Sequence, residues 1–310
     1  MSPPPAPPSE PTPSNSPTLA AQLSPRALRH NPLAQRILSG VVVLPIIIVL
    51  IIEGGPGLAA LVSLVLAVAV LEFGLGMRLT RDDPVLWLAL AGAVAMTAAT
   101  LTNDIPTHWP LTAAIAAIVA TPVLQQFVRE WGQPPNDGSD PIPFAALYER
   151  TAAGLVALTY VGWLGSFFLL LRQLPQGEEW LLLAVFAGMA TDTGAFVVGK
   201  LIGRRPMAPR ISPRKTVEGG IGGLVAGFAA VLLINLLPDL EVAVWKMVLL
   251  GIAVPLMATA GDLSESVIKR ALDVKDFSKL VPGHGGVLDR LDSLLFVVPT
   301  VYFFVRWIVL

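Results

Sequence analysis

The sequence predicts an all-α, polytopic membrane bundle of about nine transmembrane helices. Hydrophobic residues make up 54% of its 310 positions and charged residues only 14%, whereas ordinary soluble domains carry about 25% charged residues. Nine apolar runs approach or exceed the roughly 20 residues that a spanning helix needs. The cations, moreover, gather in alternate loops between these runs. Composition, run length and charge distribution therefore agree on one fold class.

The predicted spans follow directly from the apolar runs. They cover residues 37–53, 56–77, 84–102, 110–128, 151–171, 180–199, 218–237, 243–261 and 291–309. The first run is short, and Pro45 is expected to kink it. A re-entrant hairpin made of the first two runs stays open as an eight-span alternative. Residues 1–30 are rich in Pro and Ser and too poor in apolar side chains to fold, so they are expected to form a disordered cytoplasmic tail.

The Lys and Arg residues predict the orientation. If the N-terminus lies inside, every cation except Arg172, Lys246 and Arg306 falls in an inner segment. Cytoplasmic loops carry such an excess of Lys and Arg. We therefore expect a multi-pass protein of the cell (inner) membrane, with the loops 200–217 and 262–290 facing the cytoplasm and the C-terminus outside.

Composition also excludes several classes of function. The chain has no cysteine, which removes disulfides and thiolate catalysis. Its histidines, His30, His108 and His284, are scattered, so a histidine-based metal site is not expected. The net charge of −1 indicates no nucleic-acid partner. Lys215-Thr216 follows Arg214, where a phosphate-binding Walker A loop requires Gly.

The stretch from residue 261 to 292 holds the densest mixture of charges in the chain. Carboxylates bind hard cations such as Mg²⁺, while Lys and Arg bind phosphate oxygens. If the eighth helix continues past residue 261, one face of it carries Asp262, Glu265, Ser266 and Lys269. Asp289 and Asp292 would share a face at the start of the ninth helix. A solvated, salt-bridged helix end is the alternative to a site for metal and phosphate together.

Asp192 and Glu72 are carboxylates inside predicted spans. Asp192 is in the sixth span, and a charge there costs about 2.5–3.5 kcal/mol on insertion scales, which marks a functional candidate. Pairing with Thr191 or Thr193 is the alternative. For Glu72, near a cytoplasmic helix end, we expect snorkelling towards the membrane surface or structural pairing with Arg78.

The loop 200–217 contains six cations and no acid. Membrane orientation explains part of this charge. Ser212, Lys215 and Thr216 are the stronger candidates for binding a triphosphate, because they combine hydroxyls and a cation at a proline turn, and the following helix could begin close to an anion. The repeated glycines Gly219, Gly223 and Gly227 predict a close helix-packing face.

One long pattern resembles a known family. It reads Ser266-x-Ile268-Lys269-Arg270, Lys275-Asp276 and Pro282-x-His284-Gly285-Gly286-x-x-Asp289-Arg290-x-Asp292. This is similar to the signature of the CDP-diacylglycerol synthases, the phosphatidate cytidylyltransferases. Val281 stands where Leu, Ile or Phe is expected. The block 212–219 and the segment from Asp192 to Lys200 resemble other parts of that family.

The resemblance implies transfer of a cytidylyl group from CTP to phosphatidic acid in the bilayer, with CDP-diacylglycerol and pyrophosphate as products. It divides the chain into N-terminal transmembrane helices at 37–179 and a catalytic transmembrane region at 180–310. It also implies a Mg²⁺ cofactor; a second cation and a homodimer stay open. The implied metal ligands are Asp262, Asp289 and Asp292.

The other implied roles fall into two groups. The catalytic group comprises Asp262, Asp289, Lys269, Arg270 and His284. The group that binds CTP or phosphatidate comprises Asp192, Lys200, Ser212, Lys215, Thr216, Ser266, Lys275 and Arg290. Another CTP-dependent lipid kinase or nucleotidyltransferase, or an ion or phosphate transporter, is the alternative function.

Overall fold

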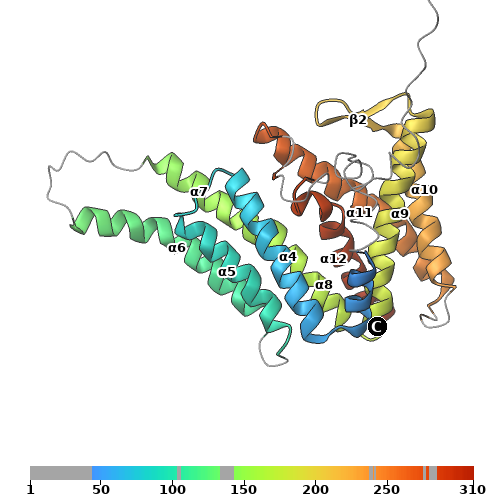
Figure 1. The fold of residues 1–310 in the computed structure, drawn as a ribbon, viewed down its shortest axis with the longest axis horizontal. Coiled ribbons are helices and arrows are strands. Elements are labelled where there is room, and N and C mark those ends of the chain that lie inside the picture. The colour runs from blue at the N-terminus through green and yellow to red at the C-terminus, as the bar shows by residue number, and fades with distance from the viewer. Residues whose placement is uncertain are drawn as a thin grey trace, which may run out of the picture.

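The computed structural model describes residues 44–102, 106–132, 143–236, 240, 242–274, 277–278 and 285–310. The predicted tail at 1–30 lies outside these residues. Figure 1 shows a bundle of helices, with a small β-hairpin at one end and the C-terminus at the other. The predicted all-α membrane class is confirmed: six helices in the described part are long and apolar enough to cross a membrane, and three shorter apolar helices accompany them.

The elements follow in chain order after a first short helix, Leu44–Glu53. They are α4 (Gly55–Gly76), α5 (Pro84–Ala99), α6 (His108–Gly132), α7 (Phe144–Val156), the π-helical segment η1 (Ala157–Trp163), α8 (Leu164–Arg172), α9 (Gly177–Ile202), β1 (Pro206–Ala208), β2 (Ser212–Thr216), α10 (Val217–Ile234), α11 (Val244–Ala271), the 3₁₀ turn η2 (Leu288–Arg290), α12 (Leu294–Phe304) and η3 (Val305–Val309).

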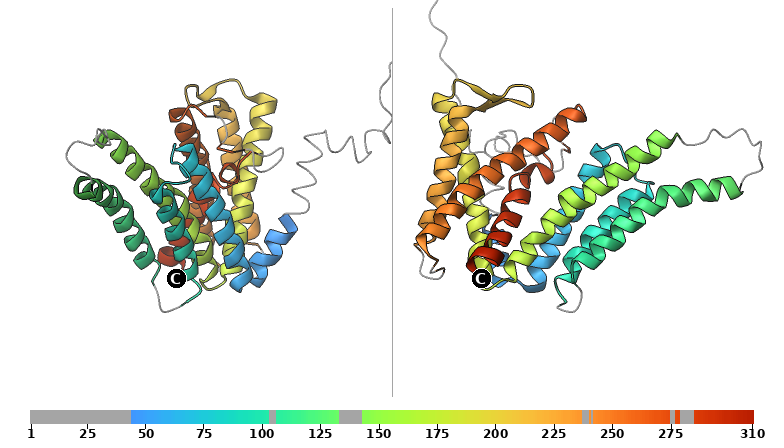
Figure 2. Two further views of the ribbon diagram at one scale, coloured as in Figure 1. Left: turned by 60° about the vertical axis from the view of Figure 1, so that its left-hand side comes forward. Right: turned by 180° about the vertical axis from the view of Figure 1, so that it is seen from behind.

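Two groups of helices make up the bundle (Figures 1 and 2). Helices α4 to α8 form one group, and α9, α10 and α11 form the other. Helix α12 packs against α8, α9 and α11, so it lies where the groups meet. The buried core runs through both groups, from Phe73 on α4 and Met96 on α5 to Trp180 on α9 and Leu250 on α11.

Local chemistry sets several helix boundaries. Gly54, the N-cap of α4, and Gly55, its first residue, have positive φ angles of 64° and 62°, a conformation that L side chains rarely adopt. Asp83 caps α5 by accepting a hydrogen bond from the Val85 N–H at 3.0 Å. The same carboxylate pairs with Arg150 Nε on α7 at 2.6 Å, which ties two neighbouring helices together.

The predicted glycine face on α10 is confirmed. An added Cβ at Gly219 or Gly223 would lie 2.8 Å from a backbone oxygen of α9, and one at Gly227 would lie 2.2 Å from Thr191 Oγ1. Such distances exclude a side chain, so α9 and α10 approach closely, as small residues permit in membrane helices.

Three boundaries differ from the sequence prediction, and each difference shapes the site. Helix α11 continues to Ala271, ten residues past the predicted end of its span. Residues 212–216 form a strand of an antiparallel hairpin rather than a tight turn, because Pro206 pairs with Thr216 and Ala208 with Ser212. Asp289 lies in a 3₁₀ turn and Asp292 in the bend after it, so the two do not share a helix face before α12.

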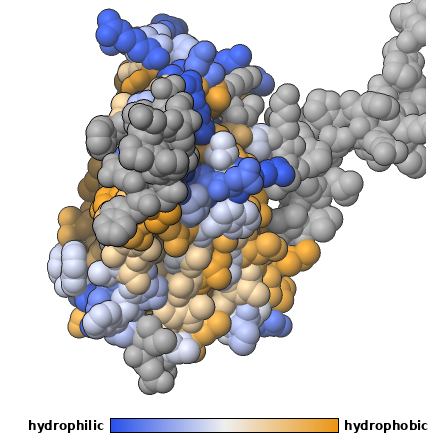
Figure 3. Space-filling view, turned by 90° about the vertical axis from the view of Figure 1, so that its left-hand side faces the viewer, coloured by the Kyte–Doolittle hydropathy of each residue, from blue (hydrophilic) through white to orange (hydrophobic). Residues whose placement is uncertain are grey.

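The loops gather at two ends of the bundle. At the C-terminal end, Arg172 donates to the backbone oxygens of Ile51 and Ile52, and Lys246 donates to the Ile308 oxygen at 2.5 Å. The hairpin lies at the opposite end (Figure 2). Between the ends, apolar side chains cover the face seen in Figure 3, while hydrophilic ones concentrate at the hairpin end. This is the pattern of a multi-pass membrane protein. The three cations predicted outside are at the C-terminal end: Arg172 and Lys246 through these contacts, and Arg306 in η3.

Candidate active site

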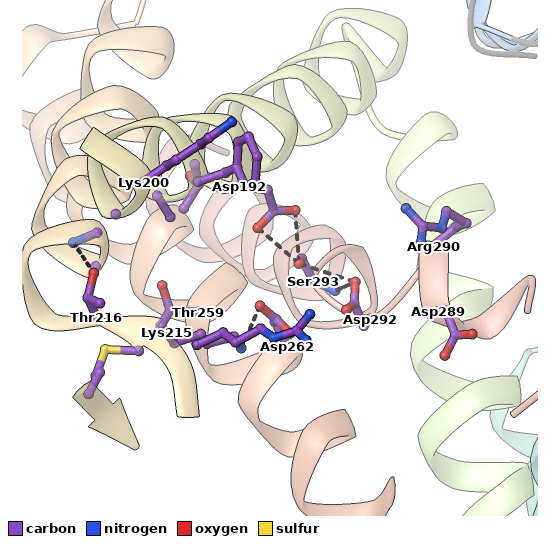
Figure 4. Close-up of a pocket in the computed structure, with 18 residues that line it drawn as sticks. Asp192, Lys200, Lys215, Thr216, Thr259, Asp262, Asp289, Arg290, Asp292 and Ser293 are labelled. Atoms are coloured by element: carbon purple, nitrogen blue, oxygen red, sulfur yellow. Dashed lines mark hydrogen bonds and ion pairs between the residues drawn. The ribbon is translucent and has the colours of Figure 1, made fainter. Parts of the chain in front are cut away.

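A polar pocket of about 520 Å³ opens where α9, β2, the first turn of α10, α11 and residues 289–293 meet (Figure 4). These elements come from widely separated parts of the sequence. Its charged lining is Asp192, Lys200, Arg214, Lys215, Asp262, Asp289, Arg290 and Asp292. The sequence predicted seven of these eight as site residues.

Strand β2 delivers Lys215 to the pocket. Its Nζ lies 2.5 Å from Asp262 Oδ2 on α11, and both side chains are partly buried. Thr216 follows as the N-cap of α10 and accepts a hydrogen bond from the Gly219 N–H at 3.2 Å. Glu218 accepts from the Arg204 N–H at 2.9 Å and the Arg205 N–H at 3.2 Å, which fixes the base of the hairpin to α10. The hairpin is therefore held so that its cation faces α11.

Asp192, on α9, faces the bend that precedes α12. The Ser293 hydroxyl lies 3.1 Å from Asp192 Oδ2 and 3.3 Å from Asp292 Oδ1, so it connects the two carboxylates (Figure 4). Gly261 permits this bend to approach α11, because an added Cβ would lie 2.5 Å from the Asp292 carbonyl oxygen. Three aspartates from three segments, Asp192, Asp262 and Asp292, thus converge on one space.

Asp289 lies apart from these three aspartates in Figure 4. Its Oδ1 is 2.5 Å from Lys269 Nζ, and its Oδ2 accepts from the Gly286 N–H at 2.7 Å. Burial opposes ionisation of this carboxyl, but Lys269 and the Gly286 N–H outweigh it, so the pKa of Asp289 lies below its usual value. Lys269 also lies 3.1 Å from Glu265, which is only 1% exposed. Asp289 is therefore a carboxylate held ionised at the edge of the pocket.

The converging carboxylates fit Mg²⁺ as a partial set of ligands. Burial first, and then the Asp262 carboxylate, raise the pKa of Asp292, and a cation bound between the two carboxylates would offset both effects. Mg²⁺ commonly takes one or two carboxylates together with waters and substrate phosphates. Within the described ranges, no three acidic or histidine side chains form a complete metal cluster. The set Asp262, Asp289 and Asp292 stays a prediction; all three line the pocket, with Asp289 apart from the other two (Figure 4).

An apolar groove of about 480 Å³ adjoins the polar pocket. Side chains of the helix Leu44–Glu53, α4, α8, α9 and the start of α12 line it, among them Ile47, Leu58, Phe168 and Val185. Four residues border both spaces: Asp192, Asp289, Arg290 and Asp292. The charged pocket and the apolar groove therefore share a border formed by these four residues.

Other predicted site residues lie away from the pocket or outside the described residues. The Arg270 Nε donates to the Ile211 backbone oxygen at 3.1 Å, which ties α11 to the hairpin. Ser212 and Ser266 do not line the pocket. Lys275 and His284 fall outside the residues that the structure describes.

Sequence reasoning missed two contributors and misplaced a third. Ser293 had no separate signal beyond its position next to Asp292. Arg214 was counted only among the cations of its loop, yet it lines the pocket. The predicted pairing of Glu72 with Arg78 is wrong: the Glu72 carboxylate accepts from Ser278 Oγ and the Leu288 N–H instead.

Comparison with known proteins decides the family. The profile of the cytidylyltransferase family matches residues 34–308, nearly the whole chain. The chain belongs to the cytidylyltransferase family. The family resemblance predicted from the 266–292 pattern is thereby confirmed.

Similar proteins carry a more specific name. The chain is 39% identical over 145 residues to the phosphatidate cytidylyltransferase of Staphylococcus saprophyticus and 40% identical over 149 residues to that of Bacillus subtilis. These alignments cover 47% and 48% of this chain, and 55% of each relative. The chain thus spans about half the length of the curated relatives it matches.

Proposed function

We propose that this cytidylyltransferase-family protein transfers the cytidylyl group of CTP to phosphatidic acid, giving CDP-diacylglycerol and pyrophosphate for phospholipid synthesis. The observation that carries the proposal is the junction of the polar pocket with the apolar groove at Asp192, Asp289, Arg290 and Asp292. A water-soluble triphosphate suits the pocket, and an acyl chain suits the groove. The two reacting groups would then meet along the charged border.

The reaction needs positioning and charge neutralisation more than proton transfer. A phosphatidate oxygen, already anionic, forms a bond to the α-phosphorus of CTP. The bond between that phosphorus and the oxygen bridging to the β-phosphorus breaks, and its electron pair leaves with pyrophosphate. Lys215 and Lys200 would bind triphosphate oxygens from one side, and Arg290 would bind the phosphatidate headgroup at the groove. Lys269 would keep Asp289 in place at the border.

Asp262 and Asp292, with Asp289 at the edge, would hold Mg²⁺ together with the substrate phosphates. When bound, the ion supplies neutralisation of phosphate charge. Lys215 and Asp262 would then work together. In the free protein the Lys215 ammonium pairs with the Asp262 carboxylate, and when CTP binds the same ammonium would face the triphosphate.

The predicted orientation complements this chemistry. With the hairpin end in the cytoplasm of a bacterial cell, the pocket receives CTP from the cytoplasm and the groove receives lipid from the inner leaflet. The relatives named as phosphatidate cytidylyltransferases support this substrate pair.

A labelling experiment on the purified full chain tests the proposal. CTP radiolabelled at the α-phosphorus and phosphatidic acid are incubated with Mg²⁺, and the lipid fraction is analysed. We expect the α-label in the lipid and pyrophosphate in solution. Label that enters lipid only from the γ-position indicates a lipid kinase, and substrate flux through vesicles without CTP consumption indicates a transporter; either result contradicts the proposal.

A further inference from the structure

Glu72 is a buried carboxylate on α4 that has no place in the pocket. It is only 7% exposed, and its neighbours along α4 are apolar. A buried charge is costly unless hydrogen bonds satisfy it. Glu72 meets this demand with donors from two segments far along the chain: Ser278 Oγ at 2.5 Å from Oε1, and the Leu288 N–H at 3.0 Å from Oε2.

The second of these donors starts the turn that carries Asp289. Leu288 is the first residue of η2, and Asp289 is the next. Glu72 therefore holds the backbone from which the Asp289 carboxylate extends to Lys269. The contact joins α4 in the first half of the chain to a site whose charged residues all come from the second half.

Gly286 fits between the two carboxylates. An added Cβ there would lie 2.7 Å from Glu72 Oε2 and 3.2 Å from Asp289 Oδ2. The Gly286 N–H also donates to Asp289. The backbone at 286–288 is thus held from one side by Glu72 and from the other by Asp289, and position 286 has no space for a side chain.

Aromatic packing holds the neighbouring segment on the same helix. The Phe277 ring lies 5.4 Å from that of Phe73, and it covers Gly76, where an added Cβ would lie 2.6 Å from the ring. Lys269 Nζ lies 5.7 Å from the same Phe277 ring. The last turns of α4 therefore contact Phe277, and Phe277 in turn lies against Lys269, the partner of Asp289.

We propose that Glu72 is a positioning residue of the active site. It fixes the 286–290 turn on α4 through Leu288 and Ser278, and it thereby sets the position of Asp289 relative to Lys269 and the pocket border. It touches no substrate itself. For its activity readout this inference rests on the proposed cytidylyl transfer; its structural readout is independent of that function.

Three variants of the full-length protein test the inference. Glu72→Ala removes both acceptors, whereas Glu72→Gln keeps an acceptor for the Leu288 N–H and can donate its amide to the Ser278 oxygen. Ser63→Ala is the matched control, because it removes a 2.7 Å hydrogen bond between α4 and Thr97 of α5, away from the pocket. Each variant is purified with wild type, and its kcat, its KM for CTP and its melting temperature are measured. Amide exchange at Leu288 is followed by mass spectrometry.

Loss of an outer hydrogen-bond partner of a metal site typically lowers activity about 10–100-fold. We expect Glu72→Ala to lower kcat by that factor, with little change in KM for CTP, and to accelerate amide exchange at Leu288. Ser63→Ala should keep the kcat and the Leu288 exchange rate of the wild type. Glu72→Gln should recover most of kcat and of the Leu288 protection.

Two results overturn the inference. One is unchanged Leu288 exchange in Glu72→Ala. The other is a Ser63→Ala variant that loses as much kcat as Glu72→Ala, since general loosening of α4 would then explain the effect. If wild type transfers no cytidylyl group, the proposed function fails, and the exchange comparison still decides whether Glu72 positions the turn.

Discussion

Replacing Lys215 by Met tests whether the hairpin delivers a phosphate-binding cation. The substitution keeps most of the aliphatic length and removes the charge that lies 2.5 Å from Asp262. Lys215 lines the pocket, whereas Arg204, eleven positions earlier in the same cation-rich loop, does not. Arg204 is exposed, and its backbone N–H, which a side-chain change spares, makes the bond to Glu218. Arg204→Met is therefore the matched control.

The expected size of the effect follows from the contacts. A hydrogen bond to a charged group contributes about 1.5–3 kcal/mol, which corresponds to roughly 10- to 150-fold in binding at 1.4 kcal/mol per tenfold. Loss of Lys215 also leaves Asp262 without its paired cation, and the carboxylate would then repel the triphosphate. Both consequences weaken CTP binding. An exposed charge such as that of Arg204 contributes about 0–1 kcal/mol, so its removal should change binding by less than about fivefold.

The assay is CTP titration of cytidylyl transfer by the purified protein, with phosphatidic acid and Mg²⁺ saturating. We expect KM for CTP to rise, or turnover to fall, far more in Lys215→Met than in Arg204→Met. A double-mutant cycle with Asp262→Asn separates two effects on CTP binding: loss of the contact between Lys215 and the triphosphate, and repulsion of the triphosphate by the unpaired Asp262 carboxylate. Equal, small effects at both positions would show that the charge of this loop serves membrane orientation alone, and would refute the reasoning.

Three further predictions address metal, orientation and packing. Asp262→Asn and Asp289→Asn should each lose nearly all activity, with little rescue by excess Mg²⁺, whereas Asp273→Asn should stay active; normal turnover in the first two contradicts the assigned roles. In intact cells, an impermeant thiol reagent should label a cysteine introduced at the C-terminus but not one at Arg205, and the opposite pattern overturns the orientation. Gly223→Leu should destabilise the protein by more than about 2 kcal/mol, because overpacking of a tight contact costs ~1–3 kcal/mol and here the obstacle is the α9 backbone; an unchanged melting temperature contradicts this packing.

Much of the candidate site could be predicted because its residues are chemically unusual where they occur. Asp192 is a carboxylate in an apolar span, and Asp262 and Lys269 follow helical spacing on the extension of α11. Lys215 stands in a block without acids. Each is visible from its immediate neighbours in the chain, so periodicity and charge were sufficient to identify it.

The pairings could not be predicted, because they depend on how distant segments approach. Sequence spacing suggested that Asp289 and Asp292 share one helix face, yet a 3₁₀ turn and a bend direct one towards Lys269 and the other towards Asp192 and Ser293. Glu72 lies near Arg78 in the chain but bonds 206 and 216 residues away.

The sequence by itself determined the membrane class, the approximate positions of the apolar helices and the family, since hydrophobic run length and motif spacing are properties of local segments. Only the tertiary structure decided that Lys215 faces Asp262, that an apolar groove borders the pocket, and that α4 holds the turn bearing Asp289. The physical reason is that these arrangements arise from close packing between helices, such as the glycine contacts of α10 with α9 and of Gly261 with the Asp292 backbone. The local sequence around a residue is compatible with many contacts to distant residues, and the packing of the helices decides which of these contacts forms.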